Sequence, residues 1–551
     1  MDTVGHGTHV AGIIGAYSNN AVGVAGVAWR VKLMAVKVQR PDGYLDSSAV
    51  MSGLDYARQK GAKVVNASWG IFERKLDPNY TLSLESYDPL IEGAIRRLKD
   101  ARIVFVNASG NSAWNCDQTG YEEWWPFYFW GEPLDPWYGL PIPWDPTSIS
   151  DPWNYNWEIV NILVRVGPGH LSLPNMLVVN SSDGSDTHSS FSNQGRWSTD
   201  LHAPGGFNPQ GQSILSTLPG NQYGHLYGTS MAAPHVSGVL ALARAQFPWE
   251  SWRELVERAR FSIDPVGSLS YLSLSGGRLN AAKALGSRPR LVNLSTRCQV
   301  NTGEQIAIAG IAIGGPAAKV VAFRAQGPTL GGDPHNVPNS LQNPEIRIFN
   351  ESGQAIGYND DWGTLSAADK AVLASASATP FNPLESAWVG TLAPGLYTVH
   401  LNGVGGGTGV GIIEAFDADG STQNRLINVS TRCYVGTGFQ VAIAGTVVVG
   451  DKPRIVYIRA QGPTLAPYLN SVPLQNPAIA LFQGDTQIAS NNDWGGSGTP
   501  FGRRIVENGH APSDWRESAL IARLEPYTSY TVHLSGTGST TGIGIIEIYE
   551  Y

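Results

Sequence analysis

The chain has 551 residues, which corresponds to three or four domains at roughly 150 residues per domain. Its 37 Lys and Arg against 45 Asp and Glu give a net charge of −8, and the sequence has no basic stripe, which excludes a general nucleic-acid binder. The 64 Gly, 35 Pro and 10% aromatic residues predict many turns and short strands, and the absence of a long apolar run excludes a transmembrane segment.

The N-terminal segment contains the first motif whose residue types suit catalysis. Residues 6–12 read His-Gly-Thr-His-Val-Ala-Gly, which places His6 at the start of an apolar helix. The residues before His6 include neither a basic nor an apolar segment of the kind found in secretion signals.

Strand and helix patterns alternate from residue 1 to about 287. The strand patterns are apolar, β-rich runs typical of strands buried on both faces of a parallel sheet. They cover residues 31–38, 62–69, 102–109 and 176–181, and helical patterns cover 47–61, 88–101 and 230–246. This alternation predicts an α/β domain with a doubly wound, mostly parallel sheet.

A Trp-rich stretch interrupts this domain. Residues 114–157 hold 8 of the 17 Trp, mixed with Pro, Tyr and Phe in no regular period. We expect a long surface insertion, spanning about 114–170, that packs on its own aromatic side chains. A platform that binds substrate through its aromatic rings is the alternative.

The second motif whose residue types suit catalysis is Gly228-Thr-Ser-Met-Ala-Ala-Pro-His235. Its small residues predict a tight turn with Ser230 at a helix start, where unpaired backbone N–H groups face the hydroxyl. A serine hydroxyl becomes a good nucleophile when a neighbouring imidazole removes its proton.

The remaining chain is an internal duplication. Several anchor segments recur in order: 290–298 in 425–433, 324–330 in 459–465, 359–363 in 491–495, and 396–416 in 529–549. Each copy consists of short alternating or apolar runs between Gly-, Pro- and Asn-rich turns, which predicts two β-sandwich modules, at 288–420 and 421–551. Cys298 and Cys433 are equivalent positions of the repeat, and we expect them, like Cys116, to be unpaired.

The motifs at 6–12 and 228–235 together resemble the subtilisin-like serine protease family (subtilases, peptidase family S8). Segments at 30–38, 53–70, 105–111 and 191–205 resemble the family's successive strands and loops, so the resemblance covers essentially all of 1–287 outside the insertion. It implies a serine endopeptidase that works through an acyl-enzyme, with His6 as general base, Ser230 as nucleophile and Asn111 as oxyanion-hole amide. His9 and His235 match structural positions of the family.

The resemblance also implies where a peptide substrate binds. Its extended backbone would pair with Ser68-Trp69-Gly70, and Ala108-Ser109-Gly110 would form the other wall of the primary specificity pocket. Trp69 is bulky for this place, and we expect it to narrow or reshape a subsite.

One part of the family's catalytic triad is missing from the sequence. In the family the triad Asp ends a strand that lies tens of residues before the His, whereas only five residues precede His6. We expect Asp2 to belong to the loop that leads into the His6 helix. We interpret the sequence as an N-terminally incomplete record of an intact protease. The alternative is a chain that truly begins here, with His6, Ser230 and Asn111 but without the group that orients the imidazole.

The chemistry implied by the resemblance needs no cofactor. The loop at 18–24 resembles one that binds structural Ca²⁺ in many subtilases, but it differs in length by one residue, and we expect an ordinary tight loop. The Asn- and Asp-rich clusters at 359–362 and 491–494 fit either calcium turns or strand-end turns.

We therefore expect a secreted enzyme that acts on protein or peptide substrates, with C-terminal modules that bind a surface or the substrate. The alternative function is a non-catalytic, secreted scaffold in which a crippled protease domain presents two adhesive β-sandwiches. An upstream coding sequence with a strand that ends in Asp-Thr-Gly would favour the enzyme.

Overall fold

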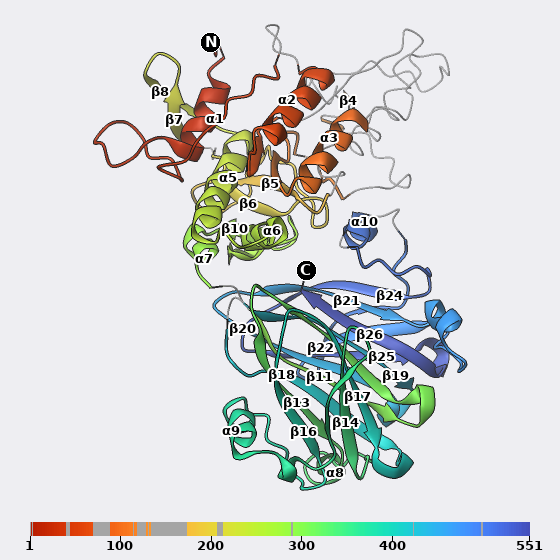
Figure 1. The fold of residues 1–551 in the computed structure, drawn as a ribbon. Coiled ribbons are helices and arrows are strands. Elements are labelled where there is room, and N and C mark those ends of the chain that lie inside the picture. Colours follow the sequence, from red (N-terminus) through yellow and green to blue (C-terminus); the bar gives the residue numbers. More distant parts are fainter. Residues whose placement is uncertain are drawn as a thin grey trace. The chain divides into compact units, whose positions relative to one another are not determined.

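A computed structural model describes two compact units (Figure 1). Unit 1 comprises Met1–Leu285 and Thr499–Glu507, and unit 2 comprises Gly286–Gly498 and Asn508–Tyr551. The structure describes residues 2, 4–39, 45–69, 89–113, 115–117, 128–129, 132–133, 173–206, 213–287, 290–421, 424–496, 500–507 and 509–550. No helix in these ranges is both long enough and apolar enough to cross a membrane.

Unit 1 is built on a sheet with the strand order β1-β2-β5-β6-β10-β9, parallel except for the β9–β10 pair. Two antiparallel hairpins, β3–β4 and β7–β8, lie outside this sheet. The strands are β1 (Val64–Ala67), β2 (Val104–Ala108), β3 (Tyr128–Phe129), β4 (Glu132–Pro133), β5 (Met176–Ser182), β6 (Leu201–Pro204), β7 (Ile214–Leu218), β8 (Gln222–Leu226), β9 (Ile263–Pro265) and β10 (Gly277–Leu279). The helices are α1 (His6–Gly15), α2 (Ser47–Gln59), α3 (Pro89–Asp100), α5 (Thr229–Gln246), α6 (Trp252–Phe261), α7 (Ala281–Leu285) and α10 (Pro500–Glu507).

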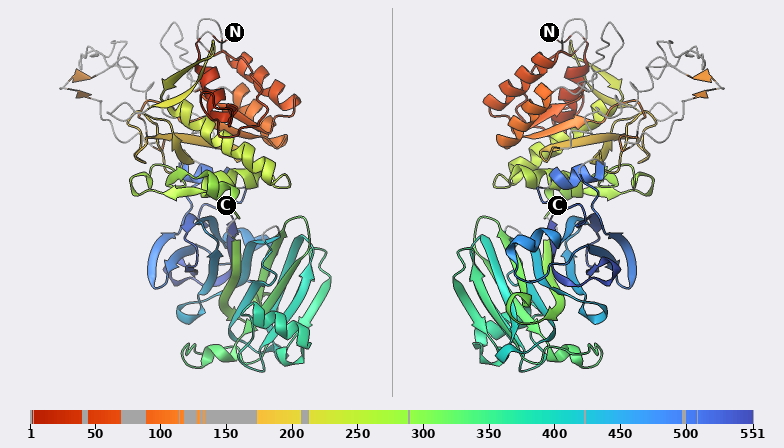
Figure 2. Two further views of the ribbon diagram at one scale, coloured as in Figure 1. Left: turned by 90° about the vertical axis from the view of Figure 1, so that its left-hand side faces the viewer. Right: turned by 90° about the vertical axis from the view of Figure 1, so that its right-hand side faces the viewer.

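Helices cover both faces of this sheet (Figure 2). Side chains of β2 alternate between the two faces: Val104 and Val106 pack in a cluster with α5 and α6, whereas Phe105 packs in a cluster with α2 and α3. The expected α/β fold with a doubly wound parallel sheet is confirmed, and the helical patterns at 47–61, 88–101 and 230–246 correspond to α2, α3 and α5.

The prediction of a buried strand at 31–38 is wrong. This segment forms no strand, and Leu33 and Met34 are 47% and 43% exposed. Within the described residues, β1 is the edge of the sheet and no strand pairs with 31–38. A strand needs a partner for its backbone N–H and C=O groups, and a local sequence pattern does not reveal whether that partner exists. Most of the Trp-rich insertion lies outside the described residues.

Unit 2 contains repeat 1 and all of repeat 2 except Thr499–Glu507, and both repeats consist mainly of strands, as the sequence predicts. In repeat 1 they are β11 (Arg290–Val300), β12 (Ala307–Gly314), β13 (Lys319–Gln326), β14 (Pro344–Asn350), β15 (Ala355–Asn359), β16 (Ser386–Leu392), β17 (Gly395–Gly403) and β18 (Gly409–Asp417), with helices α8 (Pro328–Gly331) and α9 (Ala367–Ser375). In repeat 2 they are β19 (Arg425–Val435), β20 (Ala442–Val449), β21 (Arg454–Gln461), β22 (Pro477–Gln483), β23 (Thr486–Asn491), β24 (Ser518–Leu524), β25 (Ser529–Gly536) and β26 (Gly542–Glu550).

The two repeats are joined edge to edge. Strand β11 of repeat 1 pairs with β20 of repeat 2, and β12 pairs with β19, both antiparallel. Each junction extends a row of paired strands across both repeats, in the orders β16-β13-β18-β11-β20-β25-β22-β23 and β15-β14-β17-β12-β19-β26-β21-β24. A parallel pairing of β11 with β19, at Leu291–Leu426 and Gln299–Tyr434, connects the two rows into one sheet. The junction therefore covers edge strands that a separate repeat would expose.

Equivalent residues of the two repeats meet at this junction. The hydroxyls of Thr296 and Thr431 lie 2.7 Å apart, and Cys298 and Cys433 are fully buried in one shared core. All three cysteines are free thiols, as expected. In the motifs at 359–363 and 491–495, Asn359 and Asn491 each accept a hydrogen bond from a neighbouring strand, a role that fits strand-end turns.

A directed chain of hydrogen bonds in unit 1 holds two imidazoles neutral. His188 Nε2 must donate to the Ser192 carbonyl (3.0 Å), so its Nδ1 accepts from His202 Nε2 (3.0 Å), and His202 Nδ1 accepts from Ser273 Oγ. Burial, reinforced by His188, lowers the pKa of His202 to about 3, and burial also lowers the pKa of His188.

We expect unit 1 to lose stability as the pH falls below about 6.5, because the unfolded state then binds protons that the folded pair does not accept. For His202 the loss at pH 5 is about 2 kcal/mol. Urea unfolding at pH 7.5 and 5.0 measures it, and His202→Gln should flatten the pH dependence. His225→Gln, at an exposed position, is the control; an unchanged slope in His202→Gln would contradict the assignment.

Candidate active site

Helices α1 and α5, which carry the two motifs, pack directly against each other. Val10 and Ile13 of α1 form a buried cluster with Met231 of α5. His6 lies one turn before Val10, and Ser230 directly precedes Met231. His6 and Ser230 therefore lie in the first turns of two helices that contact each other.

Ser230 is the second residue of α5, where backbone N–H groups have no partner inside the helix. The chain enters this turn through Gly228, whose φ of 140° suits glycine, and a Cβ there would lie 3.3 Å from Asn111 Nδ2. The Ser230 hydroxyl donates to the Ser68 carbonyl (3.1 Å), and the Ser68 hydroxyl donates to the Ser230 carbonyl (2.7 Å). These two hydrogen bonds hold the turn of Ser230 against the segment that follows β1.

The ring of His6 is mostly buried and makes no hydrogen bond to any residue that the structure describes, Ser230 included. Burial lowers its pKa below the ordinary value of 6.5, nearby His9 lowers it further, and Asp2 opposes the shift. The imidazole is therefore neutral at neutral pH, which is the form that accepts a proton. Hydrogen bonds of catalytic groups are often long in a free enzyme and tighten when substrate binds.

Asn111 is oriented by Thr229. Its Oδ1 accepts from both the backbone N–H and the hydroxyl of Thr229, each at 2.9 Å. Because both partners donate, the oxygen end of the amide is identified, and Nδ2 remains as an exposed donor beside the turn of Ser230. Sequence reasoning did not single out Thr229, although it lies inside the Ser230 motif.

The expected pocket wall at 108–110 is held from behind by Asn193. Asn193 Nδ2 donates to the Ser109 carbonyl (2.8 Å), its backbone N–H donates to the Gly110 carbonyl (2.9 Å), and its Oδ1 accepts from the Ser112 N–H. Ala108 and Ser109 are buried, and a Cβ on Gly110 would lie 2.4 Å from Asn193 Nδ2. Sequence reasoning missed Asn193; its only signal is its place in the segment 191–205.

The opposite wall is described only in part. Ser68 is buried and bonded to Ser230, whereas Gly70 lies outside the described residues. The ring of Trp69 packs edge-on against Phe105, 6.3 Å between centroids, within the cluster that includes α2 and α3. This side chain therefore contributes to the core of unit 1.

Asp2 and His9 have structural roles. Both carboxylate oxygens of Asp2 are occupied by the start of α1, since they accept from the N–H groups of Gly5 and Thr8 and from the Thr8 hydroxyl. Partial burial opposes ionisation of Asp2, but the hydrogen bonds from Thr8, Gly5 and Val4 outweigh it and lower its pKa to about 2. His9 Nε2 lies 3.0 and 3.1 Å from carbonyls of β7 and β8.

In the loop at 18–24, the side-chain oxygen of Asn20 accepts a hydrogen bond from within the loop. Asn20 Oδ1 accepts from the Val22 N–H (3.1 Å), and no cluster of three or more His, Cys, Asp or Glu suited to a metal occurs among the described residues. That the loop is an ordinary tight loop, and not a Ca²⁺ loop like that of many subtilases, stays a prediction.

Sequence comparisons place these features in a family. Residues 1–263 match the family model described as "Subtilase family". The chain is 31% identical to Subtilisin BL of Lederbergia lenta over 284 residues, which cover 52% of this chain and 78% of that protein. It is 30% identical to a thermophilic serine proteinase of Bacillus sp. (strain AK1) over 286 residues, but spans only about half of that relative's length (53%).

A solved structure of a protease from Pseudoalteromonas arctica PAMC 21717 matches 51% of this chain and 70% of its own, with 25% identity and a TM-score of 0.36. That score is too low to support a conclusion, so the assignment depends on the sequence matches and the motifs. The chain belongs to the subtilase family of serine proteases.

Proposed function

We propose that unit 1 is a serine endopeptidase in which Ser230 is the nucleophile, His6 the general base, and Asn111 an oxyanion-hole donor. The observation that carries the proposal is the amide of Asn111, which Thr229 orients so that Nδ2, without a partner among the described residues, lies beside the turn of Ser230. A fixed donor at this place stabilises negative charge that develops on a substrate carbonyl.

The proposed reaction has two halves. Neutral His6 removes the proton from the Ser230 hydroxyl, whose oxygen attacks the peptide carbonyl, and Asn111 Nδ2 and the Ser230 N–H bind the resulting oxyanion. The tetrahedral intermediate then expels the amine, which takes a proton from His6, and leaves an acyl-enzyme at Ser230. Water, activated by His6, releases the acid product and restores the hydroxyl.

Catalysis by His6 also depends on a group that orients its imidazole ring. Asp2 does not suit the role because its oxygens cap α1, and no other carboxylate bonds the His6 ring among the described residues. In subtilisin itself, loss of the triad Asp alone lowers kcat by about 3 × 10⁴-fold. With no carboxylate on the His6 ring among the described residues, we expect slow reaction at Ser230.

Peptide substrates and an extracellular location are part of the same proposal, since they follow from the family. Unit 2 would bind a surface or a protein substrate. The competing function is a non-catalytic scaffold, which would keep the same fold but would not react at Ser230.

Labelling by a fluorophosphonate probe tests the proposal. The chain should be labelled, slowly but covalently, and Ser230→Ala should abolish labelling because the probe forms its bond with an activated serine oxygen. Ser270→Ala, at an exposed serine of unit 1, is the matched control and should label like the unmodified chain. Absence of Ser230-dependent labelling would favour the scaffold.

A further inference from the structure

Each repeat has an equivalent connecting segment, but the helix in this segment packs in a different place in each repeat. The segment at 364–385 in repeat 1 and the one at 496–517 in repeat 2 are equal in length and lie between equivalent motifs. Each contains a short helix, α9 in repeat 1 and α10 in repeat 2. Helix α9 belongs to unit 2, whereas α10 belongs to unit 1.

Helix α9 covers its own repeat. Leu373 of α9 is fully buried in a cluster with Ala322 of β13, Ala387 of β16 and Phe416 of β18. Ala378, directly after the helix, completes this cluster. In repeat 1 the helix therefore packs over Ala322, Ala387 and Phe416 of the sheet.

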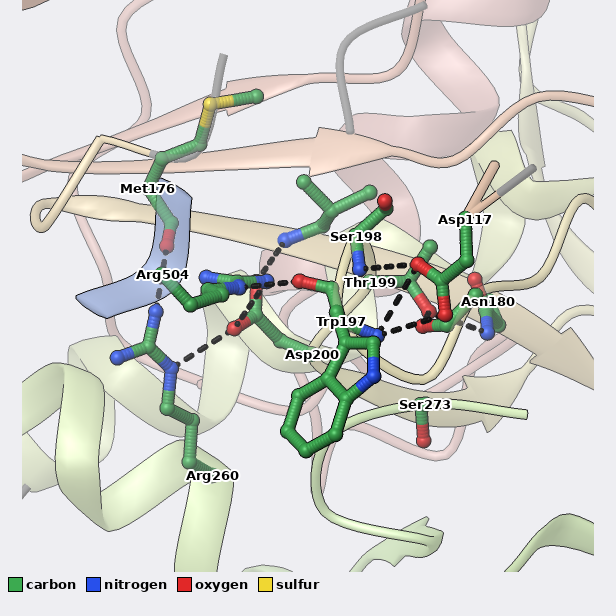
Figure 3. Close-up of polar contacts among 12 residues, drawn as sticks. Asp117, Met176, Asn180, Trp197, Ser198, Thr199, Asp200, Arg260, Ser273 and Arg504 are labelled. Atoms are coloured by element: carbon green, nitrogen blue, oxygen red, sulfur yellow. Dashed lines mark hydrogen bonds and ion pairs between the residues drawn. The ribbon is translucent and has the colours of Figure 1, made fainter. Parts of the chain in front are cut away.

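Helix α10 is instead built into unit 1 through Arg504 (Figure 3). Arg504 is 1% exposed; its Nη2 lies 3.2 Å from Asp200 Oδ1, and its Nε donates to the Trp197 carbonyl. The ring of Phe501 lies edge-on to Trp197, 4.9 Å between centroids. A buried, charge-assisted pair of this kind gives both strength and register to a contact.

Asp200 already has partners in unit 1, so Arg504 completes an existing cluster. Its Oδ2 accepts from the Val178 N–H (2.7 Å), and its Oδ1 accepts from Arg260 Nε (2.8 Å). Figure 3 shows Arg260 and Arg504 converging on this fully buried carboxylate. The Asp200 carboxylate and the Trp197 carbonyl of unit 1 thus bind the guanidinium of Arg504 together.

Repeat 2 has large side chains where repeat 1 holds its helix. Tyr457 stands at the position of Ala322, and His510 at that of Ala378. The His510 ring stacks on Tyr549, 4.1 Å between centroids, and the Tyr457 hydroxyl donates to the His510 carbonyl (2.9 Å). The place that α9 occupies in repeat 1 is therefore filled in repeat 2, which leaves α10 available for another surface.

We propose that the surface of unit 1 formed by Trp197, Asp200 and Arg260 is a docking site for helix α10 of the same chain, so that a segment of the second repeat is a working part of the protease unit. The packing in repeat 2 and the guanidinium site in unit 1 are independent observations that support it. This role is separate from the proposed peptidase activity.

The docking site is connected to the nucleophile turn through β6. Asp200 directly precedes β6, and at the other end of that strand the Gly205 carbonyl accepts from the Gly228 N–H (2.9 Å). Gly228 begins the turn that carries Ser230. Ordering of Asp200 by Arg504 therefore helps to hold the strand that supports this turn.

Cysteine crosslinking in the full chain tests the docking. The double variant Trp197→Cys, Phe501→Cys should form a disulfide rapidly in the presence of copper phenanthroline and air. In this reaction the two thiols lose two electrons and two protons, which molecular oxygen accepts. Trp197→Cys with Val506→Cys is the control, because Val506 is 44% exposed on the same helix. Equal rates in the two variants would overturn the proposal, whereas a clear preference for the Phe501 pair supports it.

Hydrogen exchange of the full chain tests the role of Arg504 itself. Arg504→Met should speed exchange at the amides of Val178, Trp197 and Ser198 by about tenfold or more, because a buried charge-assisted bond is lost. Val506→Ala should leave these amides unchanged. Exchange that is the same in Arg504→Met as in the unmodified chain would overturn the proposal.

Discussion

Alanine at Ser230 or at His6 is expected to lower kcat for peptide hydrolysis by up to about 2 × 10⁶-fold, a magnitude known from subtilisin and not deduced from this structure. Each substitution removes one half of a single proton-transfer step, so the double variant should be no slower than either single variant. Because His6 is not held by a carboxylate among the described residues, the measurable loss in this chain starts from a lower rate.

Single-turnover kinetics on a chromogenic peptide ester, whose reaction is easier than amide hydrolysis, measures these rates. His225→Ala is the control, because His225 is exposed and lies on β8. Losses that multiply in the double variant would show that His6 and Ser230 act independently, which contradicts the proposed mechanism.

Glu385→Gln is expected to destabilise unit 2 by about 3 kcal/mol, whereas Glu517→Gln should cost less than about 1 kcal/mol. Glu385 is fully buried, and its two oxygens accept from the N–H groups of four residues. These are Gly327 and Thr329 on one oxygen, and Phe381 and Asn382 on the other. A Gln side chain would turn its NH₂ group toward two of these donors and leave them without acceptors.

Glu517 is the equivalent residue of repeat 2 but is used differently. Its Oε1 accepts from the N–H groups of Gly462 and Thr464 and from the Thr464 hydroxyl, whereas Oε2 accepts no hydrogen bond from the described residues. A Gln side chain keeps all three bonds through its carbonyl oxygen. The two substitutions are chemically identical, so each serves as the control for the other.

Urea unfolding followed by circular dichroism measures this difference. The transition of unit 2 should shift to a lower midpoint in Glu385→Gln and stay near its original midpoint in Glu517→Gln. Equal shifts would contradict the hydrogen-bond assignment in both repeats.

Local sequence patterns predicted most elements because the burial of a strand or helix leaves a periodic trace in its own residues. The run at 102–109 became β2, and the small residues after Ser230 became the buried stripe of α5, where Ala232, Ala233 and Val236 are fully covered. The run at 31–38 has a similar composition, but its strand state depends on a partner elsewhere in the chain. A local pattern carries no information on that partner.

The sequence predicted which residue types form the candidate site, but it did not predict how their side chains are oriented. The motifs pointed to Ser230, His6 and Asn111 through their resemblance to a family, but they did not reveal that Thr229 sets the amide of Asn111 or that Asn193 holds the wall at 108–110. These supporting bonds join residues about 80 to 120 positions apart, and each requires the folded arrangement of several strands.

The sequence by itself determined the family, the duplicated β-rich region and the residues available for chemistry, because each corresponds to motifs or repeats that can be recognised in the sequence alone. Only the tertiary structure decided that the repeats join through β11–β20 and β12–β19, and that α10 belongs to unit 1 while α9 stays in unit 2. Edge pairing and helix docking are contacts between distant segments, and their free energy depends on which surfaces meet when the chain folds.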